Sequence, residues 1–358
     1  MLSTPSRSEA IGEEEPSGPL PAPSADPSRA LAPPTRARGR GLLIAAGAVC
    51  AALTMALHTW IPNAAVNLGS LFQTFLPWAG LSVPVLLVAA AVRRSRLAAV
   101  AVLAPATVWA CLFGGTLADK RTERTERTER TERTERSERS GGGHFTVVSH
   151  NVDEDNPDPA RTARALAASG ADVLALQEMS SKATPAYERE LAAGYPYSSD
   201  TLGVRLWSKH PLNGVEAVPI MPWTRAVRAT VETPHGPVAV FAAHLASVRL
   251  TPDAGFTTDR RNDAARKLAA AVRAEPLARV VVMGDFNGTA DDTALRPVTS
   301  QLTSAQREAG AGFGFTWPAP FPLVRIDQIL VKGMSTTSSW TLPATGSDHL
   351  PVAASLRL

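Results

Sequence analysis

The sequence predicts an α/β domain that follows three membrane-spanning helices. Long apolar runs without a charged residue fill most of residues 41–117. From residue 144 onward, short β-branched runs alternate with amphipathic helical segments, which is the pattern of an α/β domain. Polar residues recur where these β-branched runs end, and strand ends are where such domains place their functional sites.

The first 40 residues are expected to be a disordered cytoplasmic tail. They are rich in Pro, Ser, Ala and charge and contain almost no large apolar side chains. Such a segment buries too little apolar surface to offset the entropy that ordering would cost. It does not resemble a signal peptide, because the apolar part begins late and is long.

Three apolar runs follow, at about 41–60, 71–92 and 97–117. Each approaches the roughly 20 residues that cross a bilayer, so residues 41–118 are expected to form three transmembrane helices. The alternative is a set of buried helices in a soluble core.

The distribution of Arg predicts the orientation in the cell membrane. Arg93, Arg94 and Arg96 fill the second turn, whereas the first turn has no Lys or Arg. Because basic residues favour the cytoplasmic side, the part of the chain after the third span is expected outside the membrane. The Arg-rich segment that follows the third span opposes this orientation.

Residues 119–143 are expected to be a linker with an Arg-Thr-Glu repeat. A period of three does not match the helical period of 3.6, so the repeat presents no apolar face. It is either a semi-rigid charged stalk or a solvated coil. The folded domain is expected to cover 144–358.

The charge balance does not favour a nucleic-acid partner, although it leaves one possible. The formal net charge is +3, but the basic excess lies before residue 141 and the remainder is close to neutral. Binding to a duplex depends on cationic neutralisation of its phosphates. Both cysteines, Cys50 and Cys111, lie in the apolar runs, so the domain has no disulfide and no zinc-thiolate site.

Within the domain, the patterns predict two helices, at 161–169 and 259–274. Arg261, near the start of the second helix, is expected to face solvent. Strands are predicted at 145–152, 173–176, 203–208, 226–232, 238–244, 280–283, 328–331 and 352–356.

The run 280–283 is followed by the motif Gly-Asp-Phe-Asn at 284–287. Asp285 and Asn287 are two residues apart, so on an extended backbone their side chains point the same way. A carboxylate and a carboxamide at a strand end can share one hard cation and one phosphoryl oxygen. The alternative interpretation is a strand followed by an Asx turn.

Other polar residues stand in the same context, at or just after predicted strand ends. Each of them alone could be a cap, a turn residue or a solvated strand end. Together with Asp285 and Asn287 they supply five carboxylates, two amides and two histidines, which favours one metal and phosphate site. They are Asn151, Asp153, Glu178, His244, Asp327, Asp348 and His349.

At these residues the sequence resembles the endonuclease/exonuclease/phosphatase superfamily, which has the fold of pancreatic deoxyribonuclease. The order of motifs is that of the family: Asn on the first strand, Leu-Gln-Glu, His after a strand, Gly-Asp-Phe-Asn, Ile-Asp-Gln and Ser-Asp-His-Leu-Pro. The resemblance covers about 144–358. It implies a four-layer sandwich of two mainly antiparallel sheets flanked by helices, and divalent-metal phosphoesterase chemistry.

The metal residues follow from the resemblance and from ligand chemistry. Glu178 is expected to be the main ligand of Mg²⁺, with Mn²⁺ as a possible substitute, because hard cations take carboxylate oxygens. Asp348 is expected to be a second ligand. Asp153 is a further candidate, with Glu154 and Asp155 as alternatives.

The catalytic roles are assigned in the same way. Asn151 would hold Glu178 or the phosphate, and Asn287 would bind a phosphoryl oxygen. Asp285 would orient or deprotonate the attacking water. His349 would act as general base or transition-state stabiliser.

Three further roles concern the two histidines and the arginines near them. Asp327 would fix the tautomer of His349. His244 would donate to the phosphoryl group or protonate the leaving oxygen. Arg225 and Arg228 are candidates for holding a second phosphate, with strand-edge solvation as the alternative.

The expected substrate is a lipid phosphate or pyrophosphate at the membrane face. The domain is near neutral, short for its family and tethered to the bilayer. The layout also resembles the vancomycin-resistance J-type membrane proteins of actinomycetes, which implies a lipid pyrophosphate of cell-wall synthesis and antibiotic resistance. The alternatives are an extracytoplasmic nuclease that degrades DNA and a catalytically idle receptor. The sequence does not indicate an oligomeric state.

Overall fold

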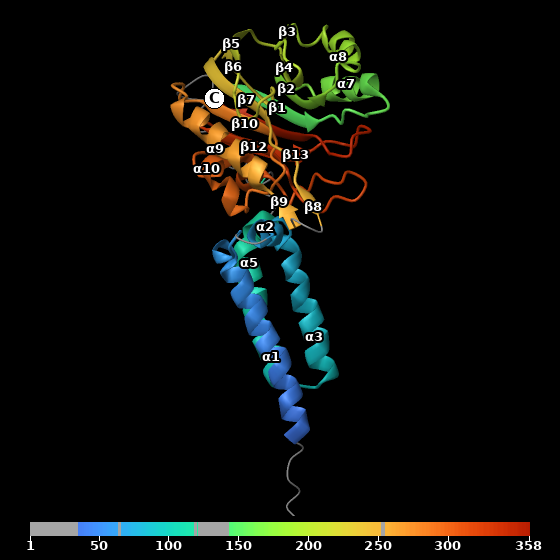
Figure 1. Cartoon of the computed structure of the whole chain (residues 1–358), viewed down its shortest axis with the longest axis vertical. Helices are drawn as coiled ribbons and strands as arrows, with labels where there is room; N and C mark the ends of the chain where they lie inside the picture. The colour runs from blue at the N-terminus through green and yellow to red at the C-terminus, as the bar shows by residue number, and fades with distance from the viewer. Residues whose placement is uncertain (1–34, 64–65, 118–119, 121–142, 252–254) are drawn as a thin grey trace, which may run out of the picture.

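The computed structural model describes residues 35–63, 66–117, 120, 143–251 and 255–358. An α/β sandwich lies at one end of the molecule, and a bundle of helices projects from it (Figure 1). Of the predicted disordered tail at 1–40, residues 1–34 lie outside the described residues, as does the Arg-Thr-Glu repeat at 121–142, so these parts remain predictions. For residues 35–40 the prediction is wrong, because the first helix begins at Thr35.

The bundle is made of helices that run to and from the sandwich. Helix α1 packs against α3, α4 and α5. The turn after α3, with Arg93, Arg94 and Arg96, lies at the end of the bundle far from the sandwich (Figure 1). The elements are α1 (Thr35–Ala56), η1 (His58–Trp60), α2 (Leu68–Thr74), η2 (Leu76–Leu81), α3 (Ser82–Val92), α4 (Arg96–Ala101) and α5 (Leu103–Leu117).

Only one helix among the described residues is long and apolar enough to cross a membrane by itself. It covers Arg96–Leu117 and so combines α4 with α5. The second apolar run is bent by 71° between Leu68–Thr74 and Leu76–Val92. Pro77 stands at the start of η2, where its missing N–H and its ring prevent the preceding helix from continuing. The first run contributes a shorter apolar helix, Gly41–Ala56. The sequence predicts three spans, whereas the structure shows one, or two if the bent pair counts as one span.

The sandwich contains two six-stranded mixed sheets, with strand orders β13-β14-β1-β2-β4-β3 and β11-β12-β10-β7-β6-β5. Each sheet has one parallel pair, β1 with β2 and β7 with β10, and its other neighbours are antiparallel. The strands of the first sheet are β1 (His144–Asn151), β2 (Val173–Met179), β3 (Tyr197–Ser198), β4 (Gly203–Ser208), β13 (Ser335–Thr341) and β14 (Val352–Arg357). Those of the second are β5 (Leu212–Ala217), β6 (Ala226–Thr233), β7 (Gly236–His244), β10 (Val280–Asp285), β11 (Thr303–Ser304) and β12 (Asp327–Lys332). A separate hairpin pairs β8 (Arg249–Thr251) with β9 (Gly255–Thr257).

Helices cover the outer face of each sheet and complete four layers. Side chains such as Val147, Val240 and Met283 fill the space between the sheets. The first sheet is covered by α7 (Pro159–Ala168) and α8 (Thr184–Leu191), whose apolar residues share its outer core. The second is covered by α9 (Asp259–Ala274), η3 (Thr293–Leu295) and α10 (Arg296–Thr299). The short helix α11 (Ala305–Ala309) contacts β12 and β13.

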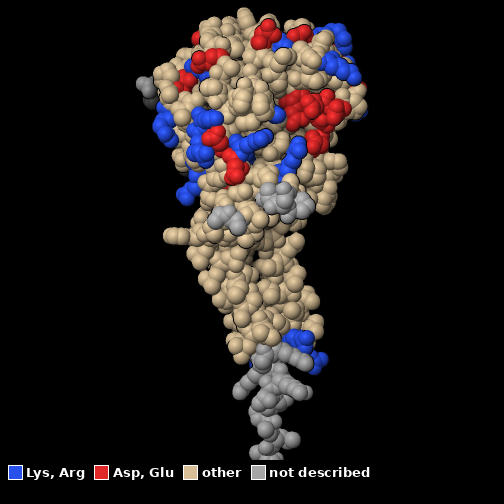
Figure 2. Space-filling view, viewed as in Figure 1, with Lys and Arg blue, Asp and Glu red and all other residues tan. Residues whose placement is uncertain are grey.

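On the face of the bundle that Figure 2 shows, no charged residue is visible along most of its length. Lys, Arg, Asp and Glu lie over the sandwich, and Lys or Arg alone appears at the far end of the bundle. Helices α3 and α5 contain no Lys, Arg, Asp or Glu.

Candidate active site

Three neighbouring strands bring the central polar residues together. Asp285, the last residue of β10, is in register with His244 of β7 on one side and with Asp327 of β12 on the other. The approach of β7 and β10 depends on Gly284, whose φ is +148° and whose added Cβ would collide with the carbonyl oxygen of Ala243. The sequence motif is therefore a steric requirement as well as a chemical one.

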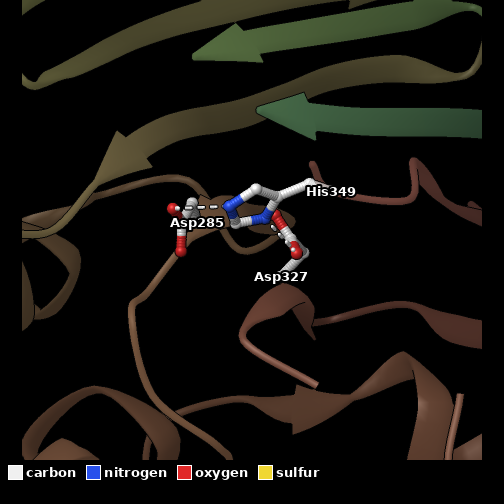
Figure 3. Close-up of side chains that lie close together, drawn as sticks. All are labelled: Asp285, Asp327 and His349. Carbon is white, nitrogen blue, oxygen red and sulfur yellow. Dashed lines mark hydrogen bonds and ion pairs between the residues drawn. The ribbon is translucent and has the colours of Figure 1, made fainter. Parts of the chain in front are cut away.

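His349 lies between the carboxylates of Asp327 and Asp285 (Figure 3). Its Nδ1 is 2.9 Å from Oδ2 of Asp327, and its Nε2 is 3.8 Å from Oδ2 of Asp285. The ring enters from the loop before β14, where Ser347 Oγ accepts a hydrogen bond from the His349 amide and donates one to the Asn151 carbonyl. The loop is thus tied to the end of β1.

Electrostatics favour the charged form of His349. Burial alone would lower its pKa, but Asp327, Asp285 and Asp348 outweigh this and raise the pKa to about 10. The ring is therefore an imidazolium at neutral pH.

Asp285 is buried and receives hydrogen bonds from both predicted amides. Asn151 donates from Nδ2 to Oδ2 at 3.1 Å, and Asn287 donates from Nδ2 to Oδ2 at 3.2 Å and from its backbone N–H to Oδ1 at 2.8 Å. Burial raises the pKa of Asp285, and the charge of Asp327 adds to this. A carboxylate with a raised pKa is a stronger base than usual.

Glu178 points toward the same centre from the end of β2. One of its oxygens is 3.6 Å from Nε2 of His244, which is itself 3.5 Å from Asp285. Its side chain is 29% exposed, so it lies at the mouth of the site. Burial raises the pKa of Glu178, and the charges of Asp285 and Asp348 raise it further.

His244 is buried and neutral, because burial lowers its pKa to about 4. Nη1 of Arg225 lies within hydrogen-bond distance of both ring nitrogens, Nδ1 and, at 3.2 Å, Nε2. Nε2 also faces Glu178 and Asp285. Arg225 thus lies against His244 in the site.

Asp348 is positioned by a tryptophan that the sequence did not single out as functional. The indole of Trp317 donates to Oδ2 of Asp348 at 3.0 Å, and Oδ1 lies 3.8 Å from Nε2 of His349. The carboxylate of Asp153 instead accepts a hydrogen bond from the Asp155 amide in the turn after β1.

Two arginines are placed differently from the expectation. Arg228 forms a two-pronged ion pair with Glu275, at 2.9 and 3.0 Å, and has no contact with the site residues above. Its predicted role as a substrate ligand therefore has no support in the described residues. Arg261, expected to face solvent, is 1% exposed and donates to Asp292 and to the carbonyl of Asn287.

Three of the predicted site residues adopt left-handed backbone conformations. The φ angles are +62° at Asp153, +56° at Glu178 and +48° at Asn287. Non-glycine residues in this region are strained, and such strain persists where the surroundings over-determine the conformation, as they often do at active sites.

The donor set fits a divalent cation. Ligand atoms of Asp285, Asp327 and His349 lie within 4.8 Å of one another, and of these the two carboxylates are the candidate cation ligands, because the imidazolium of His349 has no free lone pair. Oδ1 of Asp327 is buried without a hydrogen-bond partner among the described residues. The pKa values of Glu178 and Asp285 are raised because burial and neighbouring carboxylates disfavour their charged forms. A bound cation would offset this repulsion between the carboxylates.

Comparison with known proteins agrees with this geometry. Residues 148–349 match the sequence profile of the endonuclease/exonuclease/phosphatase family. No curated protein matches the sequence.

Solved structures share the fold at low sequence identity. D. rerio TDP2 complexed with single strand DNA product is 18% identical, with a TM-score of 0.51 over 60% of this chain and 100% of that chain. An endonuclease/exonuclease/phosphatase from Bacteroides vulgatus is 18% identical, with a TM-score of 0.50 over 60% and 99%. Sphingomyelinase C from Streptomyces griseocarneus is 19% identical, with a TM-score of 0.45 over 60% and 99%. At these identities the similarity shows the fold alone.

Proposed function

The chain belongs to the endonuclease/exonuclease/phosphatase family, and from this premise we propose that it is a membrane-anchored, divalent-metal-dependent phosphohydrolase. Its proposed substrate is a lipid phosphate or pyrophosphate of cell-wall synthesis on the outer side of the cell membrane. Members of the family are hydrolases, either phosphoesterases or nucleases. The proposal rests on one observation: the domain that holds the converging Asp, Glu and His side chains packs directly onto an apolar helical bundle. Ring stacking of Trp78 on Phe315 marks this contact.

One helix of the bundle supports a membrane anchor. One segment, Arg96–Leu117, is long and apolar enough to span a membrane alone. Arg93, Arg94 and Arg96 lie at the end of the bundle opposite the domain (Figure 1). If those arginines are cytoplasmic, the domain is on the outer side.

The proposed chemistry uses one cation, one base, Asp285, and one hydrogen-bond donor, His349. Glu178 and Asp348 would hold Mg²⁺, which when bound polarises a phosphoryl oxygen and neutralises its charge. Asp285 takes the proton of the attacking water. His349, as an imidazolium held by Asp327, donates a hydrogen bond to the phosphoryl group. Asn287 would bind a second phosphoryl oxygen, in exchange for one of the hydrogen bonds that its side-chain nitrogen donates to the Leu245 carbonyl and to Asp285.

His244 and Asn151 complete the proposed site. His244 is neutral, and it would bind the leaving group's oxygen as a hydrogen-bond donor through its one ring N–H. Asn151 holds Asp285 in place through its hydrogen bond.

The nearly neutral domain and its position on the bundle favour a lipid over DNA. An extracytoplasmic endonuclease is the second candidate, and the fold is shared with a TDP2 structure that contains a single strand DNA product. That similarity concerns the fold, so the choice rests on the bundle.

A substrate panel separates the two candidates. The full chain in lipid nanodiscs is offered a polyprenyl pyrophosphate, a sphingolipid and plasmid DNA in parallel, with Mg²⁺ or with EDTA. We expect Mg²⁺-dependent phosphate release from the polyprenyl pyrophosphate, abolished by Glu178→Ala. Glu232→Gln is the matched control, because Glu232 contacts Asn213 outside the site. Plasmid nicking without phosphate release from a lipid would favour the nuclease.

A further inference from the structure

We infer that the end of the bundle next to the sandwich positions residues of the active site. Ser70 of α2 and Trp78 of η2 are the positioning residues. This inference deepens the proposed function and rests on it. It concerns how the anchor holds two residues of the site, Asn287 and Asp348, in place.

The first connection runs from Ser70 to Asn287. The Ser70 hydroxyl donates to Oδ1 of Asp292 at 3.0 Å. Oδ2 of Asp292 accepts from Nη2 of Arg261 at 2.6 Å, and Nη1 of Arg261 donates to the carbonyl oxygen of Asn287 at 3.1 Å. Asn287 in turn donates from its amide and its side chain to Asp285. A continuous set of hydrogen bonds therefore joins the bundle to the central carboxylate.

Burial makes this connection specific. Ser70 and Asp292 are 0% exposed and Arg261 is 1% exposed. A buried ion pair costs desolvation free energy unless its remaining donors and acceptors are satisfied. Ser70 and the Ala294 amide supply partners for Oδ1 of Asp292. A residue of α2 thus completes the hydrogen bonding of the buried Asp292–Arg261 ion pair. A bundle that only tethers the domain would not need this contact.

Gln73, one turn along α2, holds the same region from a second point. Its side-chain oxygen accepts hydrogen bonds from the amide and hydroxyl of Thr293, at 2.8 and 3.1 Å. Its side-chain nitrogen donates to the carbonyl of His58 in the bundle. The segment after Asn287 is therefore fixed between the domain and the bundle, which helps Asn287 keep its strained left-handed conformation.

The second connection runs from Trp78 to Asp348. The Trp78 indole donates to the carbonyl of Leu323 at 2.8 Å, and its ring stacks on Phe315 at a centroid distance of 5.8 Å. Phe315 and Leu323 flank Trp317, whose indole donates to Asp348. The same loop accepts the bundle on one side and supports a proposed metal ligand on the other.

The experiment uses the full chain in nanodiscs and conservative variants. Ser70→Ala removes the hydroxyl that binds Asp292, and Ser82→Ala is the matched control, because the buried Ser82 hydroxyl of α3 has no partner among the described residues. Trp78→Phe keeps a stacking ring but loses the N–H to Leu323. Trp60→Phe is its control, since Trp60 is 81% exposed.

We expect Ser70→Ala and Trp78→Phe each to lower kcat about tenfold with an unchanged KM, because loss of a hydrogen bond loosens the reacting groups. Backbone amides of 287–292 should exchange with deuterium about tenfold faster in Ser70→Ala, whereas those of 280–283 should not. Both controls should match the wild type. Equal kcat and equal exchange in Ser70→Ala and Ser82→Ala would overturn the inference, as would faster exchange spread evenly over the domain.

The two proposals fail in different ways. If the wild type hydrolyses no phosphate ester, the proposed function fails. The deuterium exchange rates of residues 287–292 in Ser70→Ala then test by themselves whether the bundle holds Asn287 in place. If the wild type is active and Glu178→Ala is not, but the bundle variants behave as wild type, only the connection fails.

Discussion

Nδ1 of His349 lies 2.9 Å from Oδ2 of Asp327, so Nε2 is the ring atom that faces Asp285, at 3.8 Å. The two carboxylates hold the ring as an imidazolium, with a pKa of about 10. A group in this state donates a hydrogen bond and cannot accept the proton of water. Of the two roles that the sequence allows for His349, we propose transition-state stabilisation, and we propose Asp285 as the base.

Asp327→Asn should lower kcat by about a hundredfold or more, the scale of a lost acid–base group. Its main signature is in the pH profile. Without the Asp327 charge the pKa of His349 falls, so the alkaline decline in kcat should begin at lower pH. Asp263→Asn on the exposed face of α9 is the control, since Asp263 pairs with Arg266 and Lys267 of the same helix. An unchanged alkaline limb in Asp327→Asn would contradict this role.

His349 should also make the fold less stable at high pH. Its folded pKa of about 10 lies above the ordinary value of 6.5, so the folded state binds the proton more tightly than the unfolded state. The stabilisation is complete below pH 6.5 and is lost as the pH rises to about 10. Thermal unfolding in EDTA should show a falling midpoint over this range, and His349→Gln should flatten the slope. The same slope in both proteins would refute the assignment.

Mg²⁺ should raise the thermal unfolding midpoint of the wild type, because a ligand that binds only the folded state stabilises it. Glu178→Gln should remove most of this shift and raise the Mg²⁺ concentration for half-maximal activity by at least about a hundredfold. Glu232→Gln should keep the wild-type shift. A full Mg²⁺ shift in Glu178→Gln would show that the cation binds elsewhere.

Gly284→Ala should prevent folding or destabilise the domain by several kcal/mol. The new Cβ would collide with the carbonyl oxygen of Ala243, at a φ of +148° that side chains rarely adopt. Gly194→Ala is the matched control, because its Cβ would meet nothing within 4 Å and its φ is not positive. Urea unfolding of the two variants gives the comparison, and near-equal midpoints would mean that β10 can shift at no cost.

Much of the sandwich could be predicted from the sequence, because its central strands are strongly apolar. All eight predicted strands and both predicted helices are present, with ends that differ by a few residues. The edge strand β5 was missed because five of its six residues are exposed and it lacks an apolar pattern. β13 was missed because it is rich in Ser and Thr and also lacks an apolar pattern, although none of its residues is fully exposed.

The site could be predicted as a set of residue types but not as a geometry. Periodicity predicted that Asp285 and His244 stand at strand ends. It did not predict that they are neighbours, because the register of β7 and β10 depends on tertiary structure. Arg261 looked solvent-facing because its partners Ser70 and Asp292 are distant in sequence. The contact of Trp317 with Asp348 depends on a loop whose path no local pattern specifies.

Anomalous diffraction from crystals of the full chain grown with Mn²⁺ would test whether these side chains share one cation. We predict a single strong peak bound by the Glu178 carboxylate, beside Asp285 and His349. No peak at this place, or a peak that Glu178 does not contact, would contradict the assignment of the site.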